Sequence, residues 1–338
     1  MLRLTILMLS CATLPALADE AAGAAAPGSL APVVARIKQS VVMVQTWSKD
    51  QPSPLLRDPA FARFFGADRA EPKERETAGT AFVVDAAAGL LVTSDYVVRD
   101  ADRIQVVLPG GELRPATVVG HDEATGVGLL RIAPEGLVAL PWSDVEPAAG
   151  DPAVLVAHVF KRGPITTVGI VAGSDDSLDG FAIPSLFIDV AVNRGAAGGV
   201  IATPEGRVIG MAYGSYGVGS DPYASLGVAV PASEMRPVVE ALARDGRVRR
   251  GWIGITVTPA VLRRGALIVE VEEGSPAAQA GLEKDQEIVA VNGVAIRDDQ
   301  PLRRAVARSP VGSKLSLSVL KAEDDVREIS ITTAERPD

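Results

Sequence analysis

Between residues 80 and 230 the chain alternates short apolar runs with glycine, proline and aspartate. The runs are rich in β-branched residues, and turn signals recur after roughly 8 to 12 residues, with no stretch that suits a helical crossover. This pattern predicts antiparallel β-barrels or a sandwich. The predicted strands are 41–46, 81–84, 90–93, 104–108, 116–119, 128–132, 153–157, 165–172, 186–190, 200–201, 208–211 and 227–230.

Helices are predicted only at the edges of this region. A short one fits 30–39, and a longer one fits 233–244, with Pro231 before it and Gly246 after it. Residues 48–77 show no alternation and carry phenylalanines at helical spacing, which predicts a long loop with a short helix.

After residue 250 the pattern changes to two strands, a short helix, a strand, a longer helix and two more strands. We therefore predict a small α+β domain over 251–336, joined by a charged linker at 246–250 to a first domain over 31–245. Residues 19–30, which are rich in alanine, glycine and proline, are predicted to form a flexible leader.

Residues 1–18 have the layout of a cleavable secretory signal. Arg3 supplies a positive charge, an apolar stretch follows, and Ala16-Leu17-Ala18 offers small residues at a cleavage site. The stretch is too short to span a bilayer, and no other run is long and apolar enough. Cleavage would remove Cys11, the only cysteine, whereas a lipid anchor at Cys11 is the weaker alternative because the apolar region before it is poor. We expect a periplasmic protein.

Length and charge narrow the class of partner. A chain of 338 residues has room for about two domains with cores of their own. Its formal net charge of -9 repels phosphate backbones and anionic lipids, so we expect no nucleic-acid partner. No metal and no cofactor are expected.

Several segments carry recognisable motifs in a fixed order. They are 79–84 (GTAFVV), 91–98 (LVTSDYVV), 122–132 (DEATGVGLLRI), 193–201 (NRGAAGGVI) and 227–231 (GVAVP), followed by 251–255 (GWIGI), 274–282 (GSPAAQAGL) and 288–293 (IVAVNG). In this order they resemble the Deg/HtrA family of trypsin-like serine proteases with a C-terminal PDZ domain. The resemblance implies an all-β double β-barrel of the trypsin type followed by a small α+β PDZ domain, and a homo-oligomer, with a trimer as the suspected state.

The resemblance also places the three positions of the catalytic triad. Tyr96 stands at the histidine position, Gly126 at the aspartate position and Ala197 at the serine position. Hydrolysis of this type needs a hydroxyl nucleophile, an imidazole base and a carboxylate, and none of the three residues supplies its part. We therefore expect that the chain is not an enzyme. The two histidines, His121 and His158, are interpreted as structural residues of strands or turns.

The surroundings of these positions offer little replacement chemistry. Ser94 and Asp95 flank Tyr96 on a predicted strand, so their side chains should point to opposite faces and form no dyad. The resemblance implies an oxyanion hole made by the backbone N–H groups of Gly195 and Ala197. The alternative, which we favour, is that the glycines of this segment serve a tight turn.

A peptide-binding groove is a further implication of the resemblance. A PDZ domain adds a peptide as an extra strand and captures its terminal carboxylate with backbone N–H groups. The corresponding residues here are Trp252, Ile253, Gly254, Ile255, Val257, Leu302 and Val306. A place in the small core is an equal alternative for Ile253 and Val306. Gly254 is interpreted as a loop residue that lets the backbone approach a ligand closely.

Taken together, these motifs predict an exported Deg/HtrA-like pseudoprotease that binds peptides or unfolded proteins, including C-terminal tails, as a chaperone-like or scaffolding module. Two alternatives stay open. One is an active serine endopeptidase with unconventional catalytic residues, and the other is a structural or regulatory subunit of a hetero-oligomer with an active paralogue.

Overall fold

The computed structural model describes residues 28–49, 74–175, 184–216, 226–260, 265–322 and 325–335. The predicted signal at 1–18, with Cys11, lies outside the described residues. So does the phenylalanine-rich part of the predicted loop at 48–77.

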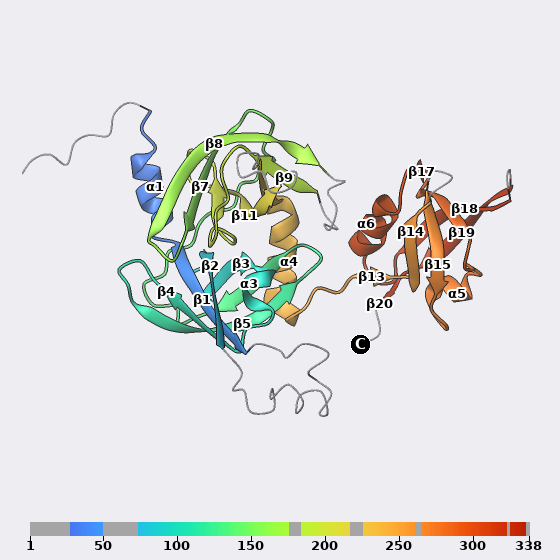
Figure 1. Ribbon diagram of the computed structural model, residues 1–338, viewed down its shortest axis with the longest axis horizontal. Helices are drawn as coiled ribbons and strands as arrows, with labels where there is room; N and C mark the ends of the chain where they lie inside the picture. Colours follow the sequence, from blue (N-terminus) through green and yellow to red (C-terminus); the bar gives the residue numbers. More distant parts are fainter. Residues whose placement is uncertain are drawn as a thin grey trace, which may run out of the picture.

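Two closed barrels form the first part of the chain (Figure 1). The strand order is β1-β2-β3-β6-β5-β4 in the first barrel and β10-β11-β12-β9-β8-β7 in the second. Closure pairs every strand on both sides, so neither barrel leaves an open sheet edge. The strands are β1 (Val41–Lys49), β2 (Glu74–Asp85), β3 (Leu90–Ser94), β4 (Arg103–Val107), β5 (Leu113–Asp122), β6 (Val127–Arg131), β7 (Pro152–His158), β8 (Pro164–Asp175), β9 (Ser185–Ile188), β10 (Val200–Ala202), β11 (Val208–Tyr216) and β12 (Leu226–Pro231). The predicted double β-barrel of the trypsin type is confirmed.

One apolar core joins the two barrels. Val92 and Leu129 of the first barrel belong to the same buried cluster as Val156 and Met211 of the second. Burial of this continuous apolar surface is the main force that holds the barrels side by side. Residues at the seam between them are therefore fixed by both halves of the domain.

Two helices flank the barrels. The first, α1 (Ala31–Lys38), precedes β1, and α4 (Ala232–Asp245) packs on β5 and β6 of one barrel and on β11 and β12 of the other. Gly246 ends α4 in the left-handed conformation, with φ 72°, and its N–H donates to the carbonyl of Leu242 at 2.9 Å. The helix predicted at 233–244 is confirmed. No helix in the described segments is both long and apolar enough to cross a membrane.

The C-terminal part is a separate small domain with its own core, seen beside the barrels in Figure 1. Its main sheet has the order β14-β15-β16-β18-β19, β17 pairs with β16, and β13 pairs with β20. The strands are β13 (Gly251–Trp252), β14 (Ile255–Pro259), β15 (Ala266–Val271), β16 (Glu287–Val291), β17 (Val294–Ala295), β18 (Lys314–Ala322), β19 (Asp325–Thr332) and β20 (Ala334–Glu335). The helices are α5 (Pro276–Gln279) and α6 (Gln300–Arg308). The predicted α+β PDZ domain is confirmed.

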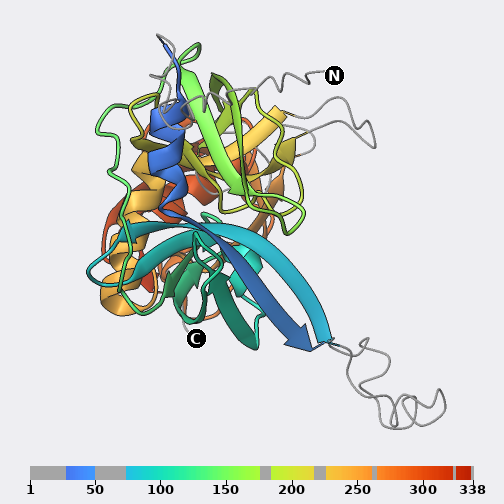
Figure 2. The ribbon, with the colours of Figure 1, turned by 90° about the vertical axis from the view of Figure 1, so that its left-hand side faces the viewer.

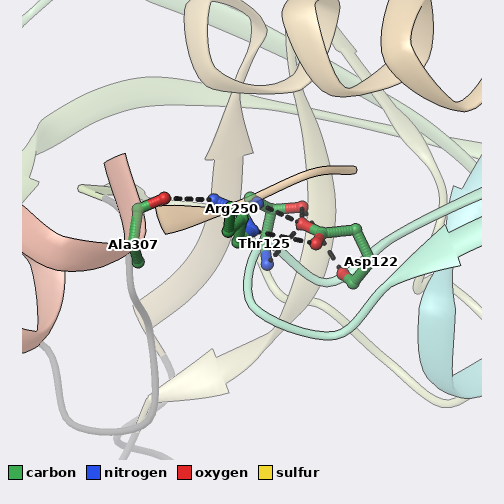
Figure 3. Close-up of polar contacts among 4 residues, drawn as sticks. All are labelled: Asp122, Thr125, Arg250 and Ala307. Carbon is green, nitrogen blue, oxygen red and sulfur yellow. Dashed lines mark hydrogen bonds and ion pairs between the residues drawn. The ribbon is translucent and has the colours of Figure 1, made fainter. Parts of the chain in front are cut away.

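A linker arginine joins the two domains (Figure 3). The Arg250 Nε atom donates to Asp122 Oδ1 at 3.1 Å, and one terminal nitrogen donates to the Ala307 carbonyl at 3.2 Å. Asp122 in turn accepts a hydrogen bond from the N–H of Thr125 at 3.1 Å. The turn between β5 and β6 is thereby tied to the C-terminal end of α6. A second ion pair, between Arg308 and Glu234, joins α6 to α4.

Two local predictions differ from the structure. The hairpin of β1 and β2 is longer than predicted, because polar residues on both strands continue the pairing as far as Lys49 and Glu74; the two strands run as a long paired ribbon in Figure 2. The segment around Tyr96 is not a strand. It forms the short helix α3 (Asp95–Val98), so the argument that its neighbours point to opposite faces of a sheet is wrong.

Candidate functional site

The three residues that the resemblance assigns to the triad lie on segments from both barrels. Tyr96 lies on α3, Gly126 lies in the turn between β5 and β6, and Ala197 lies in the segment before β10. The N–H of Asp95 donates to the Gly126 carbonyl at 3.0 Å, which links α3 to that turn. The N–H of Thr80 on β2 donates to the Ala197 carbonyl at 2.9 Å, which links the first barrel to the second.

A second tyrosine occupies the space beside Gly126. The ring of Tyr213, from β11, meets the ring of Tyr96 edge to face, with the ring centroids 6.2 Å apart. A Cβ atom at Gly126 would lie 2.3 Å from Cε2 of Tyr213. The ring therefore fills the volume into which a side chain at position 126 would extend. The sequence carried no signal for this role, since only the fold brings β11 to the β5–β6 turn.

Asp95 is the acidic group nearest to these rings. Its side chain is buried, and the guanidinium of Arg99 lies 3.5 Å from its Oδ2. Burial raises the pKa of Asp95 above its ordinary value, and a hydrogen bond from the backbone N–H of Tyr96 and the charge of Arg99 oppose that rise. The ionised form of Asp95 is thus destabilised by the loss of its hydration in the buried site.

Both tyrosines have raised pKa values as well. Burial is the main cause for Tyr96 and for Tyr213, and the negative charge of Asp95 adds to it in each case. A phenol with a raised pKa keeps its proton at neutral pH, so it does not accept a proton as an imidazole would. Tyr96 remains 40% exposed and faces solvent on one side.

Thr80 organises the loop 193–199, which carries Ala197. Its hydroxyl donates to the Gly195 carbonyl at 2.7 Å and accepts from the N–H of His158 at 2.9 Å. Gly198 has φ 82°, and a Cβ atom there would lie 1.9 Å from the Thr80 carbonyl oxygen. The close approach of β2 to this loop therefore requires glycine at position 198.

The backbone of the same loop carries the two N–H groups that were predicted to form an oxyanion hole. The carbonyls of Arg194 and Ala196 accept hydrogen bonds from Phe160 and Gly199. In a trans peptide the N–H points away from the carbonyl of the same unit, so the N–H groups of Gly195 and Ala197 point away from these partners. Neither N–H donates to another residue in the described part of the chain.

The two histidines lie on strands of different barrels, His158 on β7 and His121 on β5. His158, on β7, is buried, and its Nδ1 donates to the Arg162 carbonyl at 2.9 Å. Burial lowers the pKa of His158, and the hydrogen bond to Arg162 opposes this. His121 is exposed on β5. Among the residues that the structure describes, no group of three His, Cys, Asp or Glu side chains could hold a metal ion.

The second candidate site is a groove in the small domain. It has a volume of about 290 Å³ and lies between the loop before β14, the strand β14 itself and the helix α6. All seven residues predicted for peptide binding line it, together with Arg250, Gly251, Arg303 and Ala307. β14 pairs with β15 and with no other described strand, so its groove-facing edge is open to a further strand.

The loop at the end of this groove presents backbone donors. The Ile253 carbonyl accepts from Ala277 at 2.9 Å, and the Gly254 carbonyl accepts from Glu272 at 2.9 Å. Both carbonyls therefore point into the domain. The N–H groups of the same two peptide units, on Gly254 and Ile255, point the opposite way because the peptides are planar and trans. Successive N–H groups around a left-handed residue form a nest that binds anions, and Gly254 has φ 76°.

Two residues of the groove also belong to the core of the small domain. Ile253 and Leu302 are only 2% and 1% exposed and belong to the core cluster, so they form the floor of the groove. Val306 is partly buried and packs against the same cluster from the α6 side. Gly254 is required for a reason that the sequence did not indicate. A Cβ atom there would lie 2.2 Å from Cβ of Ser275, the N-cap residue of α5.

Known families match the two parts of the chain separately. Residues 79–211 match the trypsin-like peptidase domain, and residues 267–321 match the PDZ domain. A probable periplasmic serine endoprotease, DegP-like, of Chlamydia pneumoniae is 31% identical over 341 residues, which cover 92% of this chain and 69% of the relative. A protein of the same description from Brucella suis is 33% identical over 275 residues, covering 77% of this chain and 53% of the relative. The chain thus spans between about half and 69% of these two relatives.

Solved structures show the same arrangement. The HtrA-type protease AlgW with a decapeptide superposes with a TM-score of 0.72 at 27% identity, over 92% of this chain and 99% of that chain. The serine endoprotease from Yersinia pestis superposes with a TM-score of 0.69 at 24% identity, over 91% and 98%, and shows likeness of fold.

These comparisons correct one expectation from the sequence. We expected that the chain is not an enzyme, because Tyr96, Gly126 and Ala197 stand at the triad positions. The relatives are described as serine endoproteases, and a relative of Synechocystis as a putative serine protease, HhoA. Their names point to protease activity, and the expectation is contradicted.

Proposed function

Because the chain belongs to the DegP/HtrA family of serine endoproteases, with a trypsin-like domain and a PDZ domain, we propose that it captures the carboxyl ends of peptides or unfolded proteins in the groove beside β14. The relatives are described as periplasmic, and we propose the same compartment for this chain. The AlgW structure was solved with a decapeptide, which makes a peptide the natural ligand class.

One observation carries the proposal. An open strand edge, an apolar floor and a nest of two N–H groups lie together in one groove. An extended peptide would pair its backbone with β14, place an apolar terminal side chain over Ile253 and Leu302, and direct its carboxylate at Gly254 and Ile255. Each of these contacts uses a group that the structure leaves facing the groove.

A substitution on the helical wall tests this assignment. Val306→Glu places a carboxylate on the apolar wall, where it would be desolvated and would repel the carboxylate of the peptide. We expect calorimetric titration with a C-terminal peptide that ends in an apolar residue to show at least about tenfold weaker binding. The matched control is Val294→Glu on β17, which is 68% exposed and does not line the groove. Equal affinity of the two variants would remove α6 from the binding site.

A second function, hydrolysis of peptide bonds, is favoured by the names of the relatives. The chain would perform it without a hydroxyl at position 197, using groups other than those of the usual triad. The support in this chain is the loop 193–199, where the N–H groups of Gly195 and Ala197 point away from their neighbours and would stabilise an oxyanion.

Cleavage of unfolded casein by the purified chain tests the second function. If the loop 193–199 takes part, cleavage should be lost in Gly198→Ala, whose Cβ atom displaces the loop from Thr80. The variant Val294→Glu should cleave as the wild type does. Cleavage that survives in Gly198→Ala would come from a contaminant or from another site, and either outcome would count against this loop.

The proposed assemblies rest on the family resemblance alone. A trimer, a scaffolding role and mixed assembly with an active paralogue stay predictions. Cross-linking and light scattering of the full chain would measure its oligomeric state.

A further inference from the structure

An arginine side chain spans the groove and occupies part of the strand edge. Arg303, the fourth residue of α6, donates from one terminal nitrogen to the carbonyl of Val257 on β14. Its Nε donates to Asp299 Oδ2 at 2.6 Å, which holds the guanidinium in this direction. Val257 and Arg303 both line the groove. Arg303 therefore connects the two walls of the groove, the helix α6 and the strand β14.

This bridge uses an acceptor that a bound peptide needs. A strand that adds to β14 takes its hydrogen bonds from the backbone groups on the open edge, and the Val257 carbonyl is one of them, since a guanidinium from α6 reaches it. The N–H of an added peptide would compete for this oxygen. Arg303 would then turn away from Val257 and present its free donors to the peptide's side chains.

The charge of the groove decides which side chains suit those donors. Arg250 and Arg303 are the only charged residues that line the groove in the described part of the chain, and no carboxylate lines it. Arg250 is already engaged by Asp122 and Ala307. Asp299 is almost fully buried and bonds only the Nε side of Arg303, and the Arg303 side chain is 50% exposed. The guanidinium can thus pair with a ligand carboxylate without breaking its bond to Asp299.

The geometry assigns a position in the peptide. The carboxyl terminus lies at Gly254 and Ile255, and an antiparallel peptide then runs outward along β14, one residue for each residue of the strand. Val257 lies two residues beyond Ile255. The residue opposite it is the third or fourth from the carboxyl end of the peptide.

We propose that Arg303 makes this groove select C-terminal peptides with an aspartate or glutamate at the third or fourth residue from the end. The inference rests on the proposed peptide-binding function and names the ligand class of the same site. On peptide binding, the guanidinium of Arg303 would leave the carbonyl of Val257 and bond a carboxylate of the peptide. A carboxylate is the stronger acceptor for a guanidinium.

Two peptides test the inference against the full chain. They share the same apolar C-terminal residue and carry either glutamate or glutamine at both the third and fourth positions from the end. By calorimetric titration we expect the wild type to prefer the glutamate peptide by about 3- to 5-fold, as for a half-exposed ion pair. The preference should shrink in about 0.5 M salt, which screens exposed charges.

Variants assign the preference to one side chain. In Arg303→Gln the two peptides should bind equally, whereas Arg297→Gln removes the same charge from an exposed position outside the groove and should keep the preference. If Arg303→Gln unfolds at a lower temperature, Arg303→Lys replaces it as the test and should keep a reduced preference, because the charge stays and the fork is lost.

The outcomes separate this inference from the function on which it rests. Equal binding of both peptides by the wild type, or a preference that persists in Arg303→Gln, would overturn the role of Arg303 and leave peptide capture intact. Binding of neither peptide would overturn the proposed function and this inference with it.

Discussion

Gly198→Ala is expected to lower the free energy of unfolding of the double-barrel domain by about 3 kcal/mol or more. Two costs add. The residue has φ 82°, a conformation that costs an L-residue about 1–2 kcal/mol, and the new Cβ atom would lie 1.9 Å from the Thr80 carbonyl oxygen. Because that oxygen belongs to the backbone of β2, relief requires movement of the strand or the loop, and overpacking of this kind costs about 1–3 kcal/mol. Denaturant unfolding followed by circular dichroism measures the change.

The matched control is Gly136→Ala. Gly136 has φ 70°, and no atom lies within 4 Å of a Cβ built there, so the control carries the conformational cost without the collision. We expect a loss of about 1 kcal/mol. If Gly198→Ala costs no more than Gly136→Ala, the loop 193–199 does not pack against Thr80 as closely as described.

Gly126→Ala is the second large effect, with an expected loss of about 2–4 kcal/mol. Gly126 has φ 72°, and its new Cβ would lie 2.3 Å from the ring of Tyr213. Here the obstacle is a side chain, so it can be removed. In a double-mutant cycle we expect Tyr213→Ala to cancel about 1–2 kcal/mol of the loss, while the cost of the left-handed conformation remains.

Additive effects in this cycle would show that Tyr213 does not fill the space beside Gly126. Coupling would have a consequence for rebuilding a serine-protease triad at these positions. The changes Tyr96→His, Gly126→Asp and Ala197→Ser would place the three required groups, but the carboxylate at 126 would have no room. Replacement of Tyr213 by a smaller residue would be needed as a fourth change.

The barrel strands could be predicted from the sequence because buried strand positions are occupied by runs of apolar residues. The run 90–93, for example, consists of two leucines, a valine and a threonine, and all of β3 is buried. The outer half of the β1–β2 hairpin contains no such apolar run. Residues such as Arg75 and Glu76 pair with Ser48 and Trp47 through the backbone, which polar side chains do not reveal.

The helix α3 was missed for a different reason. Its residues Asp95–Val98 end in valines, which favour strands. Tertiary contacts override that preference here, because the N–H of Asp95 bonds the Gly126 carbonyl and the valines pack into the core of the first barrel. A preference of single residues does not contain that information.

In the two candidate sites, too, some residues could be predicted from the sequence and others could not. The residues predicted for peptide binding could be placed along the groove because their order resembles a known motif. Arg303 and Tyr213 were not predicted, since each acts on a residue that is distant in sequence: Arg303 on Val257, and Tyr213 on Gly126. Gly254 was also singled out from the sequence. The residue that a Cβ atom at position 254 would clash with, Ser275, lies on another element. Glycine alone does not reveal whether a ligand or the protein itself approaches it.

The central claim is that the backbone nest at Gly254 and Ile255 holds a peptide's terminal carboxylate. The most direct measurement compares one peptide with a free carboxyl terminus against the same peptide with a C-terminal amide, each titrated into the full chain. Hydrogen bonds to a charged acceptor contribute about 1.5–3 kcal/mol, so the amide should bind at least about tenfold more weakly. Equal affinities for the two peptides would contradict the claim.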